Sequence, residues 1–255
     1  MNASIEVQRE GDVVRVVIDH AAKSNALTGA LLEEFYAVLE DLSIEPVPRV
    51  MVLAGAGDKA FIGGAFIDEM AALDEDTARE FITRVHRACN ALRCFPAPVI
   101  ARIQGVALGA GLEIAACCDI RIAAEEAVFG MPEVKLGIPS VVEAALLPRL
   151  IGAGRARWLL LTGNSIGARQ ALDWGLVEQV VPREALDMAV DGAVKALLAN
   201  GPQALRAQKV LIKRWEDDPL AAGIAAGIDA FAACYSGPEP RERMAAFLAA
   251  KKKKG

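Results

Sequence analysis

The stretch QGVALGAGLEIAACCD, residues 104–119, decides the fold, because one glutamate stands in the middle of an apolar, glycine-rich run. Glu113 has no basic residue beside it, and a carboxylate is rarely buried without a partner or a function. Gly105, Gly109 and Gly111 surround the start of a predicted helix, where free N–H groups and the helix dipole favour negative charge. The stretch therefore predicts a strand that ends in glycine, followed by a helix that carries a carboxyl group.

Strands and helices alternate outward from this stretch. Alternating apolar residues predict a hairpin over residues 5–19, and helical spacing predicts a helix that follows Thr28 as its N-cap. Apolar runs predict strands at 49–57, 97–105 and 119–124, and helical spacing predicts helices near 76–93 and 109–117. This alternation favours an α/β architecture in which helices bury the strands.

The second half of the chain has a different pattern. Beyond residue 140 it is almost wholly helical, and only LVEQVV (176–181) predicts a strand. The sequence has no exact internal repeat and no Gly/Ser linker, so a separate second domain is not indicated. We expect a core over residues 1–200 and a C-terminal helical region over 201–255 that packs on this subunit or its neighbour.

Composition limits the class of protein. The chain has 255 residues, of which 54% are hydrophobic and 24% charged, so it is long enough and apolar enough to bury a large core. Its net charge of −5 gives no general attraction to nucleic acid or to anionic membranes. The first residues lack the basic and apolar blocks of a signal peptide, and we expect a cytoplasmic protein.

Cysteine and histidine do not suggest disulfide or metal chemistry. The five cysteines are odd in number and form no CxxC pair, which favours reduced thiols that fill the core. His20 and His86 have no metal-ligand partners at a useful spacing. We therefore expect no bound metal. The cysteines are Cys89, Cys94, Cys117, Cys118 and Cys234.

Two further stretches resemble parts of a catalytic site. In AFIGGAFIDEM (60–70), Gly63 and Gly64 allow the backbone to turn where a side chain would obstruct it. In FGMPEVKLGIP (129–139), Glu133 follows a proline in a segment that glycine and proline keep rigid. Each stretch alone is also compatible with an ordinary loop. Together with the central stretch they predict two backbone donor sites and two glutamates.

These segments, in this order, resemble the crotonase superfamily, the enoyl-CoA hydratase/isomerase family. The resemblance implies an α/β fold, a crotonase-like spiral of repeated strand-strand-helix units with a C-terminal helical region, assembled as a homotrimer or homohexamer. It extends from KSNALTGALLEEF near the start of the chain to RERMAAFLAAKK at its end. It rests on AFIGGAFIDEM, IARIQGVALGAGLEIAACCDIRIA, FGMPEVKLGIP, LLPRLIG and LLLTGNSIGARQALDWGLVEQVVP.

The resemblance also implies roles for particular residues. The backbone N–H groups of Ala65 and Ala110 match the pair that binds the thioester oxygen of an acyl-CoA in the family. Glu113 and Glu133 match its two catalytic glutamates, with Glu113 deprotonating water and Glu133 protonating the α-carbon. Glu113 follows Ala110 by about one helical turn, so donor and carboxylate can share a face. Contacts with CoA are implied for Lys23, Ala26, Ala65, Ile67 and Gly109.

The implied reaction is hydration of a 2-trans-enoyl-CoA to a 3-hydroxyacyl-CoA. Its partners are an acyl-CoA thioester and water, with no metal, nucleic acid or membrane, and CoA is part of the substrate rather than a separate cofactor. One alternative is a 3,2-enoyl-CoA isomerase or another crotonase-type reaction on an acyl-CoA. The other is a non-enzymatic binding protein on the same fold, which would be expected to have lost the glutamates.

Three positions leave alternatives open. Glu113 could be a structural carboxylate bonded to the backbone or to Arg102. Phe66 stands where the family usually has aspartate, which puts the pocket wall in question. SerValValGlu (140–143) replaces a stretch rich in glycine and threonine. Glu143 then either lines the acyl pocket or is a surface charge at a helix N-terminus, and we favour the surface charge.

Overall fold

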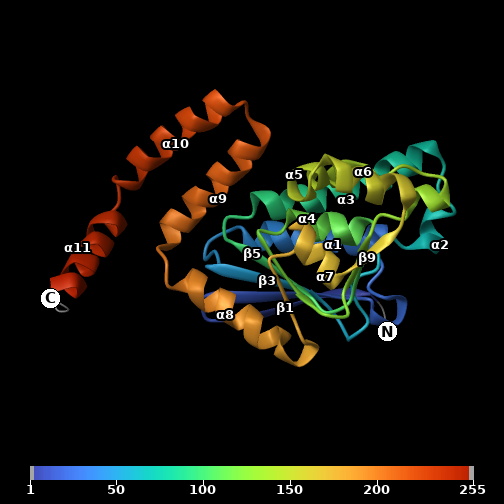
Figure 1. Cartoon of the computed structure of the whole chain (residues 1–255), viewed down its shortest axis with the longest axis horizontal. Helices are drawn as coiled ribbons and strands as arrows, with labels where there is room; N and C mark the ends of the chain where they lie inside the picture. The colour runs from blue at the N-terminus through green and yellow to red at the C-terminus, as the bar shows by residue number, and fades with distance from the viewer. Residues whose placement is uncertain (1–2, 253–255) are drawn as a thin grey trace.

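The computed structural model describes residues 3–252, which form two β-sheets surrounded by helices (Figure 1). The larger sheet has the strand order β1-β2-β3-β5-β7-β10, and the smaller has the order β4-β6-β8-β9. The strands are β1 (Ser4–Glu10), β2 (Val13–Asp19), β3 (Val50–Gly55), β4 (Ala60–Ile62), β5 (Val99–Ile103), β6 (Val106–Leu108), β7 (Ile120–Ala124), β8 (Val128–Gly130), β9 (Ser165–Gly167) and β10 (Gln179–Val181).

The chain adds one strand to each sheet in every turn of a spiral. β3 enters the larger sheet and β4 the smaller, and helices α2 and α3 follow. β5, β6 and α4 repeat this order, and β7 and β8 begin a third turn. The strand-strand-helix spiral is therefore confirmed. The short strands β4, β6, β8 and β9 were not predicted, because three residues are too few to show a periodicity.

The helices include short 3₁₀ segments at the loops that approach the site. They are η1 (Ala21–Lys23), α1 (Gly29–Leu42), α2 (Ile67–Met70), α3 (Glu75–Cys94), α4 (Ala110–Cys117), η2 (Glu133–Leu136), η3 (Val142–Leu146), α5 (Leu147–Ile151), α6 (Ala153–Thr162), α7 (Ala168–Trp174), η4 (Arg183–Ala185), α8 (Leu186–Leu198), α9 (Pro202–Asp217), α10 (Leu220–Cys234) and α11 (Glu239–Lys252). Thr28 caps α1 as predicted, since its Oγ1 accepts the N–H of Leu31 at 3.1 Å.

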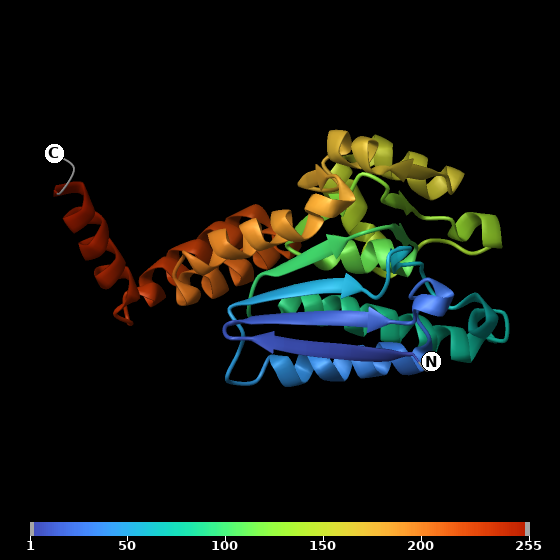
Figure 2. The same ribbon diagram turned by 90° about the horizontal axis from the view of Figure 1, so that it is seen from below.

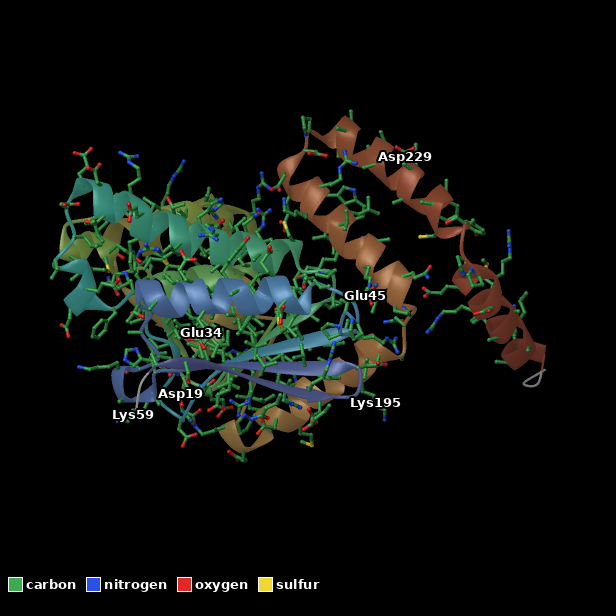
Figure 3. All side chains as sticks on the ribbon, turned by 180° about the vertical axis from the view of Figure 1, so that it is seen from behind. Asp19, Glu34, Glu45, Lys59, Lys195 and Asp229 are labelled. Atoms are coloured by element: carbon green, nitrogen blue, oxygen red, sulfur yellow. The ribbon has the colours of Figure 1, made fainter. Side chains whose placement is uncertain are left out.

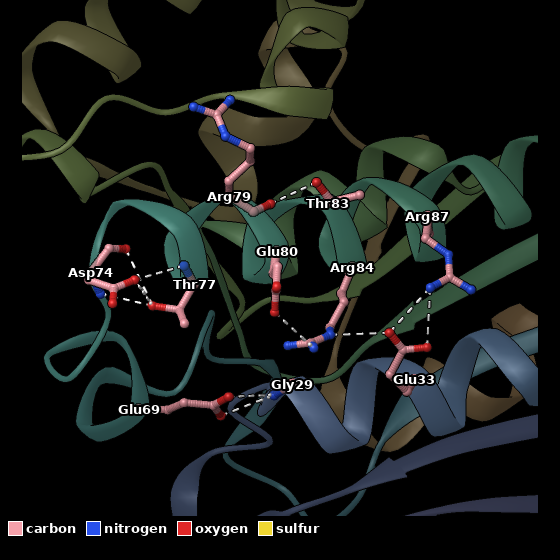
Figure 4. Close-up of polar contacts among 10 residues, drawn as sticks. All are labelled: Gly29, Glu33, Glu69, Asp74, Thr77, Arg79, Glu80, Thr83, Arg84 and Arg87. Carbon is pink, nitrogen blue, oxygen red and sulfur yellow. Dashed lines mark hydrogen bonds and ion pairs between the residues drawn. The ribbon is translucent and has the colours of Figure 1, made fainter.

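Helices bury both faces of the larger sheet. α1 and α3 lie on one face (Figure 2), where their apolar side chains pack with those of β2, and α8 covers the other face. Polar contacts hold α1 against α3 and α2, as Figure 4 shows: Arg84 and Arg87 of α3 pair with Glu33, and the carboxylate of Glu69 in α2 accepts the N–H of Gly29. α3 is therefore a fixed wall beside the central helix α4.

Two glycines allow α4 to lie in the centre of the molecule. A Cβ at Gly105 would overlap the carbonyl oxygen of Lys59, and one at Gly111 would overlap that of Ile62. All eight residues of α4, including Glu113, are buried. Gly105 and Gly111 are therefore needed for the close packing of this segment against the neighbouring backbone.

The C-terminal helices extend away from the sheets (Figures 1 and 3). The buried Lys209 joins α9 to the rest of the protein. Its Nζ lies 2.8 Å from Oδ2 of Asp119 and also donates to the carbonyl oxygens of Leu92 and Ala97. Within residues 3–252 no single helix is long and apolar enough to cross a membrane, while the bent pair of α10 and α11 reaches that length and composition together.

The five cysteines are free, and three of them fill the core as predicted. Cys89, Cys117 and Cys118 are buried between α3, α4 and the sheet. Cys94 is exposed and Cys234 is half-buried, so the core interpretation is wrong for Cys94. Cys94 lies at the last position of α3, on the side away from the core.

Candidate active site

A cavity of about 520 Å³ opens beside α4. Apolar side chains of α3, including Phe81, Ile82 and Val85, form one wall, and Leu136 and Ile138 form another. The cavity brings together six of the eight predicted site residues. These are Ala65, Ile67, Gly109, Ala110, Glu113 and Glu133.

The N–H of Ala65 is left free by the local pairing of the chain. The N–H of Leu27 donates to the carbonyl oxygen of Gly64, and the N–H of Phe66 donates to that of Leu27, both at 2.8 Å. These two bonds flank Ala65, whose own N–H has no backbone acceptor among residues 3–252. The predicted donor is therefore available to a ligand in the cavity.

The N–H of Ala110 is free because Ala110 is the first residue of α4. The described hydrogen bonds give this N–H no acceptor, while Leu112 and Glu113 donate to the carbonyl oxygen of Gly109. A Cβ at Gly64 would lie 3.1 Å from the carbonyl oxygen of Leu108, so the segment before Ala65 lies against the strand end that leads into Ala110. Both donors border one cavity.

Glu113 is 4% exposed, and one of its carboxyl oxygens has a backbone partner. Oε1 accepts the N–H of Ala144 at 3.1 Å. The pKa of Glu113 is raised from its ordinary 4.5 to about 8, mainly by burial; the Ala144 amide opposes this rise, and the charges of Glu133 and Glu143 add to it. The alternative that Glu113 bonds to the backbone is thus correct for its Oε1. The alternative that it bonds to Arg102 is wrong, because Nε of Arg102 donates to Asp187 at 2.6 Å.

Glu133 is the first residue of η2. Its Oε2 accepts the hydroxyl of Ser140 at 2.7 Å. A Cβ at Gly109 would lie 2.5 Å from its Oε1, so only glycine leaves room for this carboxyl beside Ala110. The two carboxyl groups and the Ala110 donor therefore share the cavity.

The remaining predicted CoA contacts lie outside the described walls of the cavity. Lys23 is exposed, and its Nζ lies 5.7 Å from the centre of the Phe66 ring. Ala26 is buried, and its carbonyl oxygen lies 2.7 Å from Nδ1 of His20. Phe66, which stands where the family usually has aspartate, packs on His20 and is not among the described residues that line the cavity. Over residues 3–252 no group of three or more His, Cys, Asp or Glu side chains could hold a metal ion.

The prediction that Glu143 is a surface charge is wrong. Glu143 is 5% exposed, and the described cavity walls do not include it. Its Oε1 lies 2.7 Å from Nδ1 of His86, which belongs to α3. The apolar neighbours in VVEAALL were the available signal for its burial. Ser140 and Ala144 were also missed, and no sequence signal connects either of them with the glutamate that it contacts.

The buried carboxyl of Glu113 should reduce stability above acidic pH. The folded chain holds this proton up to about pH 8, whereas the unfolded chain releases it near 4.5, so folding binds a proton in this window. Stability is therefore present at low pH and is lost as pH rises towards 8. The free energy of unfolding of Glu113→Gln, relative to that of the unmodified chain, should therefore increase by a few kcal/mol from pH 5 to pH 8, at about 1.4 kcal/mol per pKa unit. Urea unfolding at both pH values checks this, and an equal difference at the two would contradict it.

Comparisons with known proteins agree with this geometry. Residues 8–254 match the family model described as enoyl-CoA hydratase/isomerase. The short-chain-enoyl-CoA hydratase of Clostridium acetobutylicum is 36% identical over 254 residues, which cover 99% of this chain and 97% of that protein. The crotonyl-CoA hydratase of Syntrophomonas wolfei is 35% identical over 250 residues, covering 98% and 96%. The crystal structure of an enoyl-CoA hydratase from Bacillus anthracis superposes with a TM-score of 0.92 at 35% identity, covering 96% of each chain.

Proposed function

Because this chain belongs to the enoyl-CoA hydratase/isomerase family, we propose that it hydrates a 2-trans-enoyl-CoA to the 3-hydroxyacyl-CoA in the cavity beside α4. One observation carries the proposal: the carboxyl groups of Glu113 and Glu133 border the same cavity as the free backbone N–H groups of Ala65 and Ala110. Relatives that are 35% and 36% identical over nearly the whole chain bear hydratase names, which supports the same reaction. CoA enters as part of the substrate, and the reaction needs no separate cofactor.

The two N–H groups act on the thioester oxygen. Donation from Ala65 and Ala110 polarises the carbonyl, so that the β-carbon of the enoyl group becomes electrophilic. When water adds to that carbon, the electron pair moves to the thioester oxygen as an enolate, and both donors stabilise the new charge. Ala110 begins α4, so the positive end of the helix dipole adds to this stabilisation.

The two glutamates move the protons. Glu113 takes a proton from the attacking water, and its raised pKa makes it a stronger base than an ordinary carboxylate. Glu133 gives a proton to the α-carbon as the enolate collapses, which completes the addition of water. At pH 7 without substrate, Glu113 mostly holds its own proton, because its pKa is raised to about 8.

The pH dependence of hydration follows from that pKa. A base must be ionised to act, so kcat/KM should rise about tenfold per pH unit from pH 6 towards about pH 8, as Glu113 loses its proton. Initial rates with subsaturating crotonyl-CoA between pH 5.5 and 9.5 measure this. A rate that does not rise between pH 6 and pH 8 would contradict the assignment, because Glu113 must lose its proton to act as the base.

The walls of the cavity suit an apolar acyl group. Phe81, Ile82 and Val85 from α3 face Leu136 and Ile138 across about 520 Å³. Charged groups reach the cavity at Glu75 and Arg79, whose side chains are 91% and 75% exposed and so remain in contact with water. A hydrocarbon chain gains from burial against these side chains, whereas a charged chain loses its hydration.

The alternative within the family is a shift of a double bond from position 3 to position 2. It uses the same donors and one glutamate to carry the proton, so only the product distinguishes it. The protein is incubated with crotonyl-CoA and with 3-hexenoyl-CoA, and the absorbance of the conjugated enoyl thioester is followed. Loss with crotonyl-CoA supports hydration, and gain with 3-hexenoyl-CoA alone assigns the isomerase. No change with either substrate, from folded protein, would overturn the proposal.

We also propose that the C-terminal helices pack on other copies of this chain in a homotrimer or homohexamer. The support is the apolar face of α10, where Leu220, Ile224, Ile228 and Phe231 follow one another at helical spacing and are 57–81% exposed. Light scattering during gel filtration gives the mass. A monomer at all concentrations would contradict this assembly.

A further inference from the structure

A third carboxyl group lies beside Glu113 and Glu133, and the proposed reaction does not use it. Glu143 is 5% exposed and its Oε1 lies 2.7 Å from Nδ1 of His86, whose side chain is 53% exposed. Its Oε2 is buried and has no hydrogen-bond partner within residues 3–252. A buried carboxylate oxygen without a partner is costly and requires an explanation.

The backbone beside Glu143 is strained. Val142 has φ = +38°, a left-handed conformation that a β-branched side chain rarely adopts. Such conformations persist only where the surrounding structure holds them, and they cluster at functional sites. Two unfavourable features thus occur in successive residues of the short helix η3.

The next residue, Ala144, connects this turn to the catalytic glutamate. Its N–H donates to Oε1 of Glu113 at 3.1 Å. η3 packs against both α3, which carries His86, and α4, which carries Glu113. A contact that fixes Glu143 therefore fixes the peptide that holds Glu113, and the other oxygen of Glu113 stays available to water.

We propose that His86 and Glu143 form a positioning pair, which holds η3 so that the Ala144 amide orients Glu113 as the base. This inference rests on the proposed function of Glu113. Neither member of the pair touches the substrate. Each acts through the peptide between Glu143 and Ala144.

The pair also contributes to the charge around Glu113. The groups that face Glu113 are Glu133 from η2, Glu143 from η3 and the Cys89 thiol from α3. The charge of Glu143 raises the pKa of Glu113, and the Ala144 amide lowers it. Burial and the bond to Cys117 raise the pKa of Cys89 well above its ordinary value, so this thiol adds no charge. Removal of the Glu143 charge alone should consequently lower the pKa of Glu113.

Three variants separate orientation from charge. Glu143→Gln keeps a hydrogen bond to His86 without the charge, so we expect kcat within about threefold and a kcat/KM midpoint that moves to lower pH. Glu143→Ala and His86→Ala release η3, so we expect kcat to fall about tenfold, with KM for crotonyl-CoA nearly unchanged because the cavity walls remain. The matched control is Thr83→Ala on α3, since this exposed hydroxyl bonds only the carbonyl oxygen of Arg79 in its own helix (Figure 4).

The results that overturn the proposal are specific. Wild-type kcat and pH midpoint in all three variants would overturn it. So would an equal loss in Glu143→Gln and Glu143→Ala without a change in midpoint, because Glu143 would then be structural only. His86→Ala changes a half-exposed side chain, so it keeps the test available even if Glu143→Ala fails to fold.

A measurement without substrate distinguishes this inference from the proposed function. Protein labelled with ¹³C at the glutamate carboxyl is titrated by NMR, and Glu113→Gln identifies the signal of Glu113. The midpoint should move to lower pH in Glu143→Gln and not in Thr83→Ala. If it moves while the wild type converts no enoyl-CoA, the proposed function fails and the effect of Glu143 stands. If the wild type is active and the midpoint stays, the inference fails.

Discussion

The Glu113→Gln variant should lose about a thousandfold in kcat for hydration of crotonyl-CoA. Glutamine has the size of glutamate, and its carbonyl oxygen can still accept the hydrogen bond that the N–H of Ala144 donates to Oε1 of Glu113 in the unmodified chain. It cannot take a proton from water. We expect a similar loss in Glu133→Gln, which keeps the hydrogen bond to Ser140 but cannot give a proton to the α-carbon.

Binding and a matched control separate chemistry from folding. Both variants should bind 3-hydroxybutyryl-CoA nearly as well as the unmodified chain by calorimetry, because the backbone donors remain. Glu75→Gln is the control: Glu75 also borders the cavity but is 91% exposed, and we expect activity within about twofold. More than a tenth of wild-type activity in Glu113→Gln would show that Glu113 is not the base.

The Ala110→Pro variant should lose about a hundredfold to a thousandfold in kcat, because proline removes one of the two donors to the thioester oxygen. Ala110 is the first residue of α4, a position that accepts proline because its N–H makes no internal hydrogen bond in the helix. The helix, and Glu113 one turn later, should therefore stay in place. Steady-state rates with crotonyl-CoA measure the loss.

The control for Ala110→Pro is a second proline at an equivalent position. Like Ala110, Ala153 is the first residue of a helix, α6, and follows a glycine, but it is exposed. Ala153→Pro should leave kcat unchanged, and circular dichroism should show that both variants fold. Near-normal kcat in a folded Ala110→Pro would mean that the thioester oxygen is bound elsewhere.

The sequence predicts those parts of the fold that repeat a period. The hairpin of β1 and β2 and the capped helix α1 are long enough to show period 2 or 3.6, and β3, β5 and β7 are long enough to stand out as apolar runs. The second sheet is built from three-residue strands, whose pairing depends on contacts distant in sequence. The spiral therefore followed only from the resemblance to a family.

The site was predictable to the extent that a side chain stood out. Glu113 is conspicuous as a charge in an apolar run, whereas the donors Ala65 and Ala110 act through backbone N–H groups, which no side chain signals. Glu143 was assigned to the surface because charges at the start of a helix usually face water. Buried Glu143 contacts His86, which lies 57 residues away on another helix. The sequence around Glu143 cannot reveal a contact with a residue so distant in the chain.

A crystal structure with bound 3-hydroxybutyryl-CoA tests the central claim most directly. The account predicts a thioester oxygen about 2.7–3.1 Å from the backbone nitrogens of both Ala65 and Ala110, with the carboxyl groups of Glu113 and Glu133 over the adjacent carbons. A thioester oxygen out of hydrogen-bond reach of either nitrogen, or an acyl chain outside the cavity beside α4, would contradict it.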